Sequence, residues 1–432
     1  MFWPLRVIYS AILYLFLPFV LLRLLVRSHR NPALRAHWME RLGYVRALGN
    51  DRPLIWFHAV SVGEVRAAKP LVDVLRGEYP GLQILFTTMT STGADTVVQL
   101  FGETVIHRYV PYDLPAPVRR FVNITRPCCL IVMETELWPN LFHYCRITNV
   151  PVILANGRMS RKSAGRYRLV SGLTGDTLKN ITAIAAQSEK DAECFITLGA
   201  LAENVSVTGN LKYDFPLPDD FNTRLHELKR DWPPERPVWI AASTHEGEEQ
   251  VILRAQAKVI EKYPRCLLII APRHPERFSS VEALCVKSGF RTICKTEKTA
   301  PDDSIQVYVL NTMGELIFYY ALSQLAFVGG SLVPAGGHNM LEPAALGIPV
   351  ISGPYLHNFH EIGSRMQEAG TASVVHSPDE LASEVIRLFS NENLRHDAGK
   401  RGRNIVAENR GSADRCIQLI RPILGKCATY PA

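Results

Sequence analysis

The sequence lacks the short motifs that would place it in several common classes of protein. Its nine cysteines include no C-x-x-C pair, which argues against a zinc site and for reduced thiols in the cytosol. No G-x-G-x-x-G follows the first apolar run and no G-x-x-x-x-G-K-[ST] occurs, so a nicotinamide enzyme and a nucleotide triphosphatase are disfavoured. An Asp-x-Asp triplet, which would favour a metal-bridged diphosphate donor, is also absent. We therefore expect neither a cofactor nor a metal ion.

The modest excess of positive charge is dispersed along the chain. The 432 residues are 47% hydrophobic and 21% charged, with a net charge of +7. This dispersed positive charge suits an anionic substrate or a membrane surface and does not indicate nucleic-acid binding. The chain is too long for one compact core, so two domains are expected.

One long stretch near the N-terminus has no charged residue. Residues 7–22, VIYSAILYLFLPFVLL, lie between Arg6 and Arg23 without a small-residue cleavage site, which predicts an uncleaved membrane anchor over 1–27. The run is shorter than the roughly 20 residues that span a bilayer, so a buried or surface-lying helix is the alternative. By the positive-inside rule, a series of arginines places the rest of the protein in the cytoplasm. They are Arg23, Arg27, Arg30, Arg35 and Arg41.

Beyond the anchor, short apolar runs alternate with helical patterns. The predicted strands of the first half are 54–58, 83–88, 104–110, 129–133, 151–156, 183–188 and 205–209, and those of the second half are 237–243, 266–272, 305–310, 325–330 and 349–353. Apolar strands separated by helices indicate parallel sheets covered on both faces. The proline-rich stretch 210–220 reads as a linker between two doubly wound domains, over 34–212 and 213–425, with a ligand cleft between them. The last helix could pack back on the first domain.

Three loops of the second half are candidates for binding a ligand. The stretch APRHPER (271–277) presents Arg273 and His274 after a predicted strand, and an arginine fork suits a phosphate as well as it suits a surface salt bridge. Gly314 and Glu315 stand where a helix begins; backbone N–H groups there could hold a base or a sugar, although an ordinary helix start explains them too.

The third loop, VGGSLVPAGGHNMLEPAALGIPV (328–350), has the strongest local signal. Two glycine pairs permit close approach of the backbone to a ligand, and a helix N-terminus near Asn339 and Glu342 favours an anion. Glu342 could accept hydrogen bonds from a ribose diol. A capping box of Asn339 with Glu342 is the alternative, and both can hold at once.

Carboxylates follow two predicted strands of the first half. Glu64 comes directly after a Ser-Val-Gly turn, where it could complement a helix dipole or act as a base that faces a cleft. The helix N-terminus is expected to keep this carboxylate ionised at neutral pH. Glu134 and Glu136, in METELWPN, could orient an acceptor hydroxyl or cap the next helix.

Taken together, these stretches resemble the 3-deoxy-D-manno-octulosonic acid (Kdo) transferase family. The matching elements are the N-terminal hydrophobic anchor, HAVSVGE, ETELWPN, TGNLKYD, AASTHEGEE, APRHPERF and VGGSLVPAGGHNMLEPAALGIPVISGP, in order over nearly the whole chain. The resemblance implies a GT-B architecture, with an acceptor domain followed by a nucleotide donor domain. It also implies transfer of Kdo from CMP-Kdo, with inversion, to the tetra-acylated lipid A precursor in lipopolysaccharide biosynthesis, at the cytoplasmic face of the inner membrane.

Residue roles follow from the same resemblance. Glu64 would be the catalytic base. The CMP-binding residues would be Pro272, Arg273, Met313, Gly314, Glu315, Asn339, Met340, Leu341 and Glu342. A single phosphate in the donor would need an arginine and a helix N-terminus rather than a metal. The alternatives are a membrane-associated GT-B enzyme that uses a UDP-sugar, and a catalytically inactive anchored scaffold.

Overall fold

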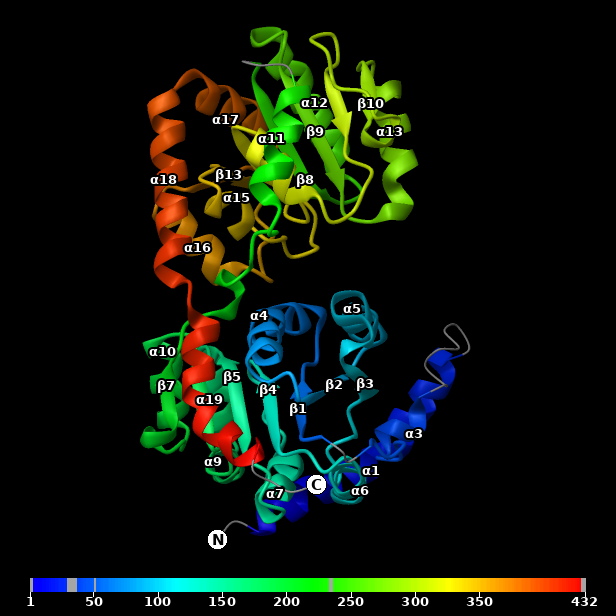
Figure 1. Cartoon of the computed structure of the whole chain (residues 1–432), viewed down its shortest axis with the longest axis vertical. Coiled ribbons are helices and arrows are strands. Elements are labelled where there is room, and N and C mark those ends of the chain that lie inside the picture. The colour runs from blue at the N-terminus through cyan, green and yellow to red at the C-terminus, as the bar shows by residue number, and fades with distance from the viewer. Residues whose placement is uncertain (1–2, 29–36, 50–51, 233–235, 429–432) are drawn as a thin grey trace. The chain divides into compact units, whose positions relative to one another are not determined.

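The computed structural model describes residues 3–28, 37–49, 52–232 and 236–428, and it divides into two compact units (Figure 1). Unit 1 comprises Met1–Phe215 with Arg410–Ala432, and unit 2 comprises Pro216–Asn409. Arg30 and Arg35, two of the arginines expected to flank an anchor, lie outside the described residues. The units are defined by packing, and the assignment of acceptor and donor roles to them stays a prediction.

Unit 1 is built on a seven-stranded parallel sheet in the order β3-β2-β1-β4-β5-β6-β7. Its strands are β1 (Leu54–His58), β2 (Gln83–Thr88), β3 (Ile106–Tyr109), β4 (Cys129–Met133), β5 (Val152–Gly157), β6 (Ala183–Ala186) and β7 (Val205–Val207). The central strands β1, β4 and β5 are buried throughout because helices cover both faces. The strand order reverses between β1 and β4, which makes their carboxyl ends the topological switch point of this sheet.

Two apolar clusters hold the helices of unit 1 against opposite faces of its sheet. One joins the sheet to α4 (Val62–Glu78), α5 (Ser91–Phe101) and α19 (Ser412–Ala428). The other joins it to α6 (Pro115–Thr125), α7 (Pro139–Ile147), α8 (Arg161–Arg168), α9 (Ser171–Leu178) and α10 (Glu189–Thr197). The apolar residues of each strand alternate between the two clusters, as the period of a strand requires.

Unit 2 repeats this plan with the sheet order β10-β11-β9-β8-β12-β13-β14. Its strands are β8 (Val238–Thr244), β9 (Leu267–Pro272), β10 (Thr292–Cys294), β11 (Val307–Val309), β12 (Leu325–Val328), β13 (Val350–Ser352) and β14 (Ala372–Val374). Its helices are α11 (Phe221–Asp231), α12 (Glu248–Lys262), α13 (Phe278–Lys287), α14 (Leu316–Leu322), α15 (Leu341–Ala345), α16 (His360–Glu368), α17 (Pro378–Ser390) and α18 (Glu392–Asn409). The two doubly wound parallel sheets confirm the predicted fold class. The short outer strands β10 and β14 were missed.

The C-terminal helix α19 belongs to unit 1, although the predicted second domain ran to residue 425. It packs beside α4, β4 and β6, and Figure 1 shows it (red) along the strands of the first sheet. Asp214 holds its N-terminus, since its carboxylate accepts hydrogen bonds from the backbone N–H groups of Gly411 (2.7 Å) and Ala413 (2.5 Å). A side chain from the 210–220 stretch thus caps a helix that begins two hundred residues later, which gives that stretch a role beyond a linker.

The N-terminal helix α1 (Trp3–Ser28) precedes a short helix, α3 (Trp38–Arg41). Within α1, Leu5–Val26 is long and apolar enough to cross a membrane by length and composition, and most of its side chains are exposed. One side of α1 rests on α7 and α9 of unit 1. The predicted anchor is therefore a helix, and one of its faces is occupied by protein.

Candidate active site

Glu64 lies at the switch point of the first sheet, in the first turn of α4. Ser61 caps this helix, and its hydroxyl lies 3.3 Å from the backbone nitrogen of Glu64, from which it accepts. The carboxylate accepts in turn from the Ser61 hydroxyl (2.8 Å) and from the backbone N–H of Val60 (2.8 Å). These bonds fix the carboxylate in one orientation at the start of the helix. The residue is only 7% exposed.

Burial raises the pKa of Glu64 to about 7, against the lowering by its hydrogen bonds to Val60 and Ser61; the charges of Glu134 and Glu136 raise it further. The expectation that this group is ionised at neutral pH therefore holds only in part, because burial raises its pKa more than the hydrogen bonds at the start of the helix lower it. Near neutral pH both protonation states are populated. A carboxylate in this condition can accept a proton from an alcohol more readily than an ordinary glutamate does.

Glu134 and Glu136 follow β4, the strand next to β1 at the switch point. Glu134 has a left-handed backbone (φ 56°), an uncommon conformation for a residue other than glycine, and its N–H donates to the carbonyl of Ala155 (2.9 Å). Its carboxylate lies 3.5 Å from the ammonium of Lys212. Glu136 accepts a hydrogen bond from the indole N–H of Trp138 (2.9 Å), while burial raises the pKa of its carboxyl group.

Lys212 is held near Glu134 by polar groups that the sequence reading did not single out. Asn156, which has φ 56° near the end of β5, accepts at its Oδ1 from the backbone N–H of Leu211 (3.0 Å). Asn210 donates to Gln187 (3.0 Å), and Gln187 donates to the carbonyl of Asn156 (3.0 Å). Among the described residues, the buried Nδ2 of Asn156 has no hydrogen-bond partner. The motif TGNLKYD was noted only as a match, and the contacts give its Asn210 and Lys212 a place at this edge.

The predicted CMP-binding residues all lie in unit 2, after the carboxyl ends of β9, β11 and β12. Pro272 ends β9 and Arg273 follows it, with its backbone N–H bonded to the carbonyl of Thr244 (3.0 Å). The nearby Arg277 is engaged elsewhere, because its guanidinium makes two hydrogen bonds (2.6 and 3.1 Å) to the buried carboxylate of Glu249. Arg277 therefore holds its loop against Glu249, and the role of Arg273 as a phosphate ligand stays a prediction.

Glu248, which the sequence reading did not single out, shapes the first glycine pair. It is fully buried, and its carboxylate accepts hydrogen bonds from four backbone N–H groups at 2.7 to 3.0 Å, those of His245, Gly330, Ser331 and Leu332. A Cβ at Gly329 would come within 2.6 Å of the carbonyl oxygen of Ser243. This glycine is thus required by packing against β8 rather than by a ligand.

In the loop after β11, the backbone is more accessible to a ligand than the side chain of Glu315 is. Gly314 has φ +83°, and a Cβ there would meet no described atom within 4 Å. The Glu315 carboxylate is engaged with Arg224 (3.0 Å), Thr312 (2.5 Å) and Lys295. Burial alone would raise the pKa of Glu315, but the bonds from Lys295 and Thr312 bring it below its usual value. Glu315 therefore positions this loop, and Met313 is half exposed beside it.

The side chains of Asn339 and Glu342 contact each other at the start of the short helix α15, and the ligand-binding role of segment 339–342 stays a prediction. Asn339, which precedes the N-cap residue Met340, accepts from the backbone N–H of Leu341 (3.0 Å) and donates to the carboxylate of Glu342 (2.9 Å). The side chains of Met340 and Leu341 are fully buried. These two residues can meet a ligand only through their backbone.

A cluster of three histidines lies between these loops. The Nε2 atoms of His245 and His338 are 2.8 Å apart and their rings are stacked, while His274 packs edge-on against His245. Burial lowers the pKa of His245, and the charges of His274, Arg273 and Arg277 lower it further. One ring must donate to the other, so the accepting ring is neutral and carries its proton on Nδ1. Only His274 of this cluster was noticed in the sequence.

Comparison with known proteins gives matches over nearly the whole chain. Residues 36–215 match a family model described as 3-Deoxy-D-manno-octulosonic-acid transferase (kdotransferase), and residues 236–405 match Glycosyl transferases group 1. A 3-deoxy-D-manno-octulosonic acid transferase of Haemophilus influenzae is 41% identical over 97% of this chain and 99% of its own. A 3-deoxy-D-manno-octulosonic acid transferase of Bordetella pertussis is 33% identical over 86% of this chain and 87% of its own. The structure of a putative UDP-N-acetylglucosamine 2-epimerase of Listeria monocytogenes shares the fold, with a TM-score of 0.54 and 14% identity. The match covers 88% of this chain and 98% of the epimerase chain.

The raised pKa of Glu64 predicts the acid side of the pH profile. If Glu64 must be deprotonated to react, kcat/KM should rise with pH through an apparent pKa of about 7. Removing a neighbouring negative charge should ease the ionisation of Glu64. In Glu134→Gln, kcat/KM should therefore rise at a lower pH than in the unmodified protein, even if its maximum value also changes.

The matched control is Glu103→Gln, which removes an exposed carboxylate from the same unit. Its profile should coincide with that of the unmodified protein. An unchanged midpoint in Glu134→Gln would show that the ionisation seen in the profile does not belong to Glu64.

Proposed function

This chain belongs to the 3-deoxy-D-manno-octulosonic acid (Kdo) transferase family, and from that premise we propose that it moves Kdo from CMP-Kdo to a hydroxyl of the lipid A precursor. The observation that carries the proposal is the buried Glu64, held in one orientation at the switch point with a pKa of about 7. This is where ligands bind in doubly wound sheets, and a base for an alcohol needs this ionisation range.

In the proposed reaction, the acceptor oxygen forms a bond to the anomeric carbon of Kdo while its proton passes to Glu64. The bond between that carbon and the phosphate oxygen breaks, and its electron pair leaves with CMP. Attack from the face opposite the phosphate inverts the anomeric carbon. The leaving phosphate is already an anion, so a second carboxyl group is not needed to protonate it, in contrast to a glycosidase.

Glu64 retains the capacity to take this proton although both of its oxygens are hydrogen-bonded. Each carboxylate oxygen has two lone-pair sites, and the structure gives each oxygen one hydrogen bond, from Val60 or from Ser61. One site on each oxygen remains for the acceptor hydroxyl. We propose that Glu134 with Lys212 orients the acceptor, since this ion pair stands at the end of the neighbouring strand.

In unit 2 we propose that the CMP phosphate is held by Arg273 and by backbone N–H groups at the start of α15. Arg273 supplies a planar fork of donors. The loops after β9, β11 and β12 supply backbone, because the side chains of Met340, Leu341 and Glu315 are buried or engaged. The neutral accepting ring of the His245–His338 pair adds an Nδ1–H that could donate to the departing phosphate.

We further propose that α1 attaches the protein to the inner face of the cytoplasmic membrane. Its exposed apolar surface supports this, as does an acceptor that is a lipid. The family supports a place in lipopolysaccharide biosynthesis. Positive net charge suits the phosphates of such an acceptor and of an anionic membrane.

The proposed activity is tested by incubating the purified protein with CMP-Kdo and tetra-acylated lipid A precursor in excess EDTA. We expect release of CMP and product masses that increase by whole Kdo residues, at nearly the rate found with magnesium. Among the described residues, three potential metal ligands come together only at Glu282, Cys294 and Glu297, where burial raises the pKa of the Cys294 thiol to about 12 and so opposes thiolate binding. Turnover only with a UDP-sugar, or only with added magnesium, would contradict the proposal.

Arg273→Ala should weaken the use of CMP-Kdo. Loss of a charge-assisted bond to phosphate costs about 1.5–3 kcal/mol, or roughly 10- to 150-fold in kcat/KM for the donor. Arg273→Lys should recover part of this, because it keeps the charge and loses the fork. Arg254→Ala, which removes an exposed arginine from α12, is the control and should behave like the unmodified protein. Equal effects on donor and acceptor titrations would count against a phosphate role for Arg273.

A further inference from the structure

The N-terminal half of α1 is fastened to unit 1 by polar side chains. The hydroxyl of Tyr9 donates to the carboxylate of Asp113 (3.0 Å), and Ser10 donates to the side-chain oxygen of Asn140 (3.1 Å), as Arg6 does (3.2 Å). Asp113 is buried and also accepts from two backbone N–H groups at the start of α7. A helix that served only as a tether would not need this docking face.

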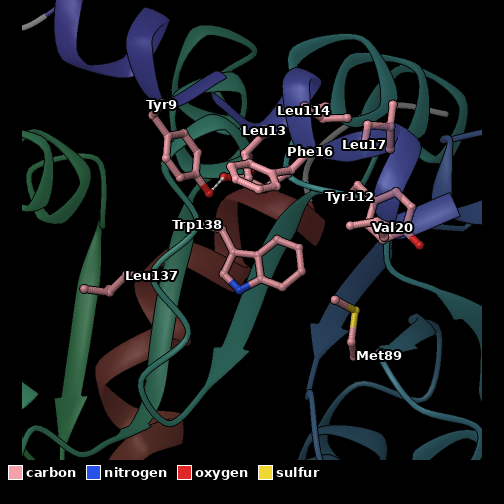
Figure 2. Close-up of a pocket in the computed structure, with 11 residues that line it drawn as sticks. Tyr9, Leu13, Phe16, Leu17, Val20, Met89, Tyr112, Leu114, Leu137 and Trp138 are labelled. Atoms are coloured by element: carbon pink, nitrogen blue, oxygen red, sulfur yellow. Dashed lines mark hydrogen bonds between the residues drawn. The ribbon is translucent and has the colours of Figure 1, made fainter. Parts of the chain in front are cut away.

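Next to these polar contacts, and sharing Tyr9 and Asp113 with them, lies a mostly apolar cavity of ≈ 250 Å³ (Figure 2). It is lined by Tyr9, Leu13, Phe16, Leu17, Val20, Met89, Tyr112, Asp113, Leu114, Leu137 and Trp138. Figure 2 shows the indole of Trp138 beneath the α1 side chains Leu13 and Phe16. Both carboxylate oxygens of Asp113, the one charged group in the lining, already accept hydrogen bonds. The chemistry of the wall therefore suits a hydrocarbon.

The contacts along α1 also indicate how this helix meets a membrane. They run from Arg6 to Val20, which is about 20 Å of helix at 1.5 Å per residue. If α1 crossed the bilayer upright, α7 and its charged neighbours would be drawn into the hydrocarbon with it. A helix that lies in the interface avoids this cost. Its outer face, with Leu15 69% and Phe19 65% exposed, then enters the lipid while its inner face covers the cavity.

We propose that this cavity receives one acyl chain of the lipid acceptor, an inference that rests on the function proposed above. The cavity adjoins the candidate active site through Trp138. The indole N–H of Trp138 donates to Glu136, and its ring packs edge-on against His58 at the end of β1. Glu136 is one of the two acids whose charge raises the pKa of Glu64. A chain in the cavity would thus lie beside the carboxylates at which the sugar head group reacts.

The gain from filling the cavity is positional. Lipid tails are as apolar as leucine side chains, so a chain that leaves the bilayer for this cavity gains little hydrophobic energy. Its benefit is that the attached head group is held in place for reaction. Blocking the cavity should therefore impair reaction of the acylated acceptor and have no specific effect on an acceptor without chains.

Leu17→Trp is designed to fill the cavity, and Leu15→Trp makes the same change on the outer face of α1 as a matched control. Both are measured with tetra-acylated and with deacylated acceptor. With the acylated acceptor, we expect kcat/KM of Leu17→Trp to fall about tenfold below that of Leu15→Trp. With the deacylated acceptor the two variants should be equal. Equal rates with both acceptors would overturn the proposal.

Leu17→Ala provides a second test in case Leu17→Trp does not fold, because it enlarges the cavity and introduces no clash. It should shift the preference of the protein toward acceptors with longer chains, and an unchanged preference would count against the proposal. If the unmodified protein itself releases no CMP with either acceptor, the proposed function has failed, whereas loss of the chain-dependent difference alone is a failure of the cavity assignment.

A direct binding measurement uses Trp138 as a reporter. The difference in fluorescence between the unmodified protein and Trp138→Phe isolates the emission of this indole. An acceptor brominated on its acyl chains should quench that difference signal, and a brominated phospholipid at the same mole fraction should not. Equal quenching by the brominated acceptor and the brominated phospholipid would show that any membrane lipid enters the cavity. No quenching by either lipid would show that no acyl chain enters it. Both results would overturn the proposal.

Discussion

The burial of one carboxylate, Glu64, is the constraint on which the rest of the candidate site depends. Folding raises its pKa, so the protonated form is favoured in the folded protein. That contribution to stability is complete below the unfolded value of 4.5 and is lost as the pH rises through about 7. The hydrogen bonds from Ser61 and Val60 keep the group in place, and the ion pair of Lys212 partly offsets the nearby charge of Glu134. The proposed base is thus a carboxylate whose charged form is disfavoured by its buried surroundings.

In unit 2, buried acids serve a different purpose. Glu248 accepts four backbone N–H groups and Glu249 binds Arg277, so both carboxylates hold loops in position. These loops therefore have fixed positions in the folded protein. Positioning of this kind lowers the entropy that binding must overcome. Buried glutamates thus hold loops in position in unit 2, whereas in unit 1 the buried Glu64 is the proposed base.

The sequence allowed the fold to be predicted because each central strand is a continuous apolar run that ends in a turn. The short outer strands β10 and β14 carry too few apolar residues for this signal. Glu64 was identified as a candidate by its place after β1, but the sign of its pKa shift depends on burial and on Glu134 and Glu136, which are some seventy residues away. Lys212, Asn156 and the His245–His338 pair acquire meaning only through tertiary contacts. The docking of α1 on Asp113 likewise cannot be read from an apolar run, and the roles of the CMP-binding candidates stay predictions.

The most direct test of a base at this position is Glu64→Gln, assayed for turnover, CMP affinity and thermal stability in the same preparation. The amide keeps the shape of the side chain and resembles the protonated form that the folded state already favours, so stability and CMP binding should be nearly unchanged. Turnover should fall by roughly 10²-fold or more, because the amide cannot take the proton of the acceptor hydroxyl. Near-normal turnover per folded molecule, with a loss of stability, would instead make Glu64 a helix-capping residue and place the base elsewhere.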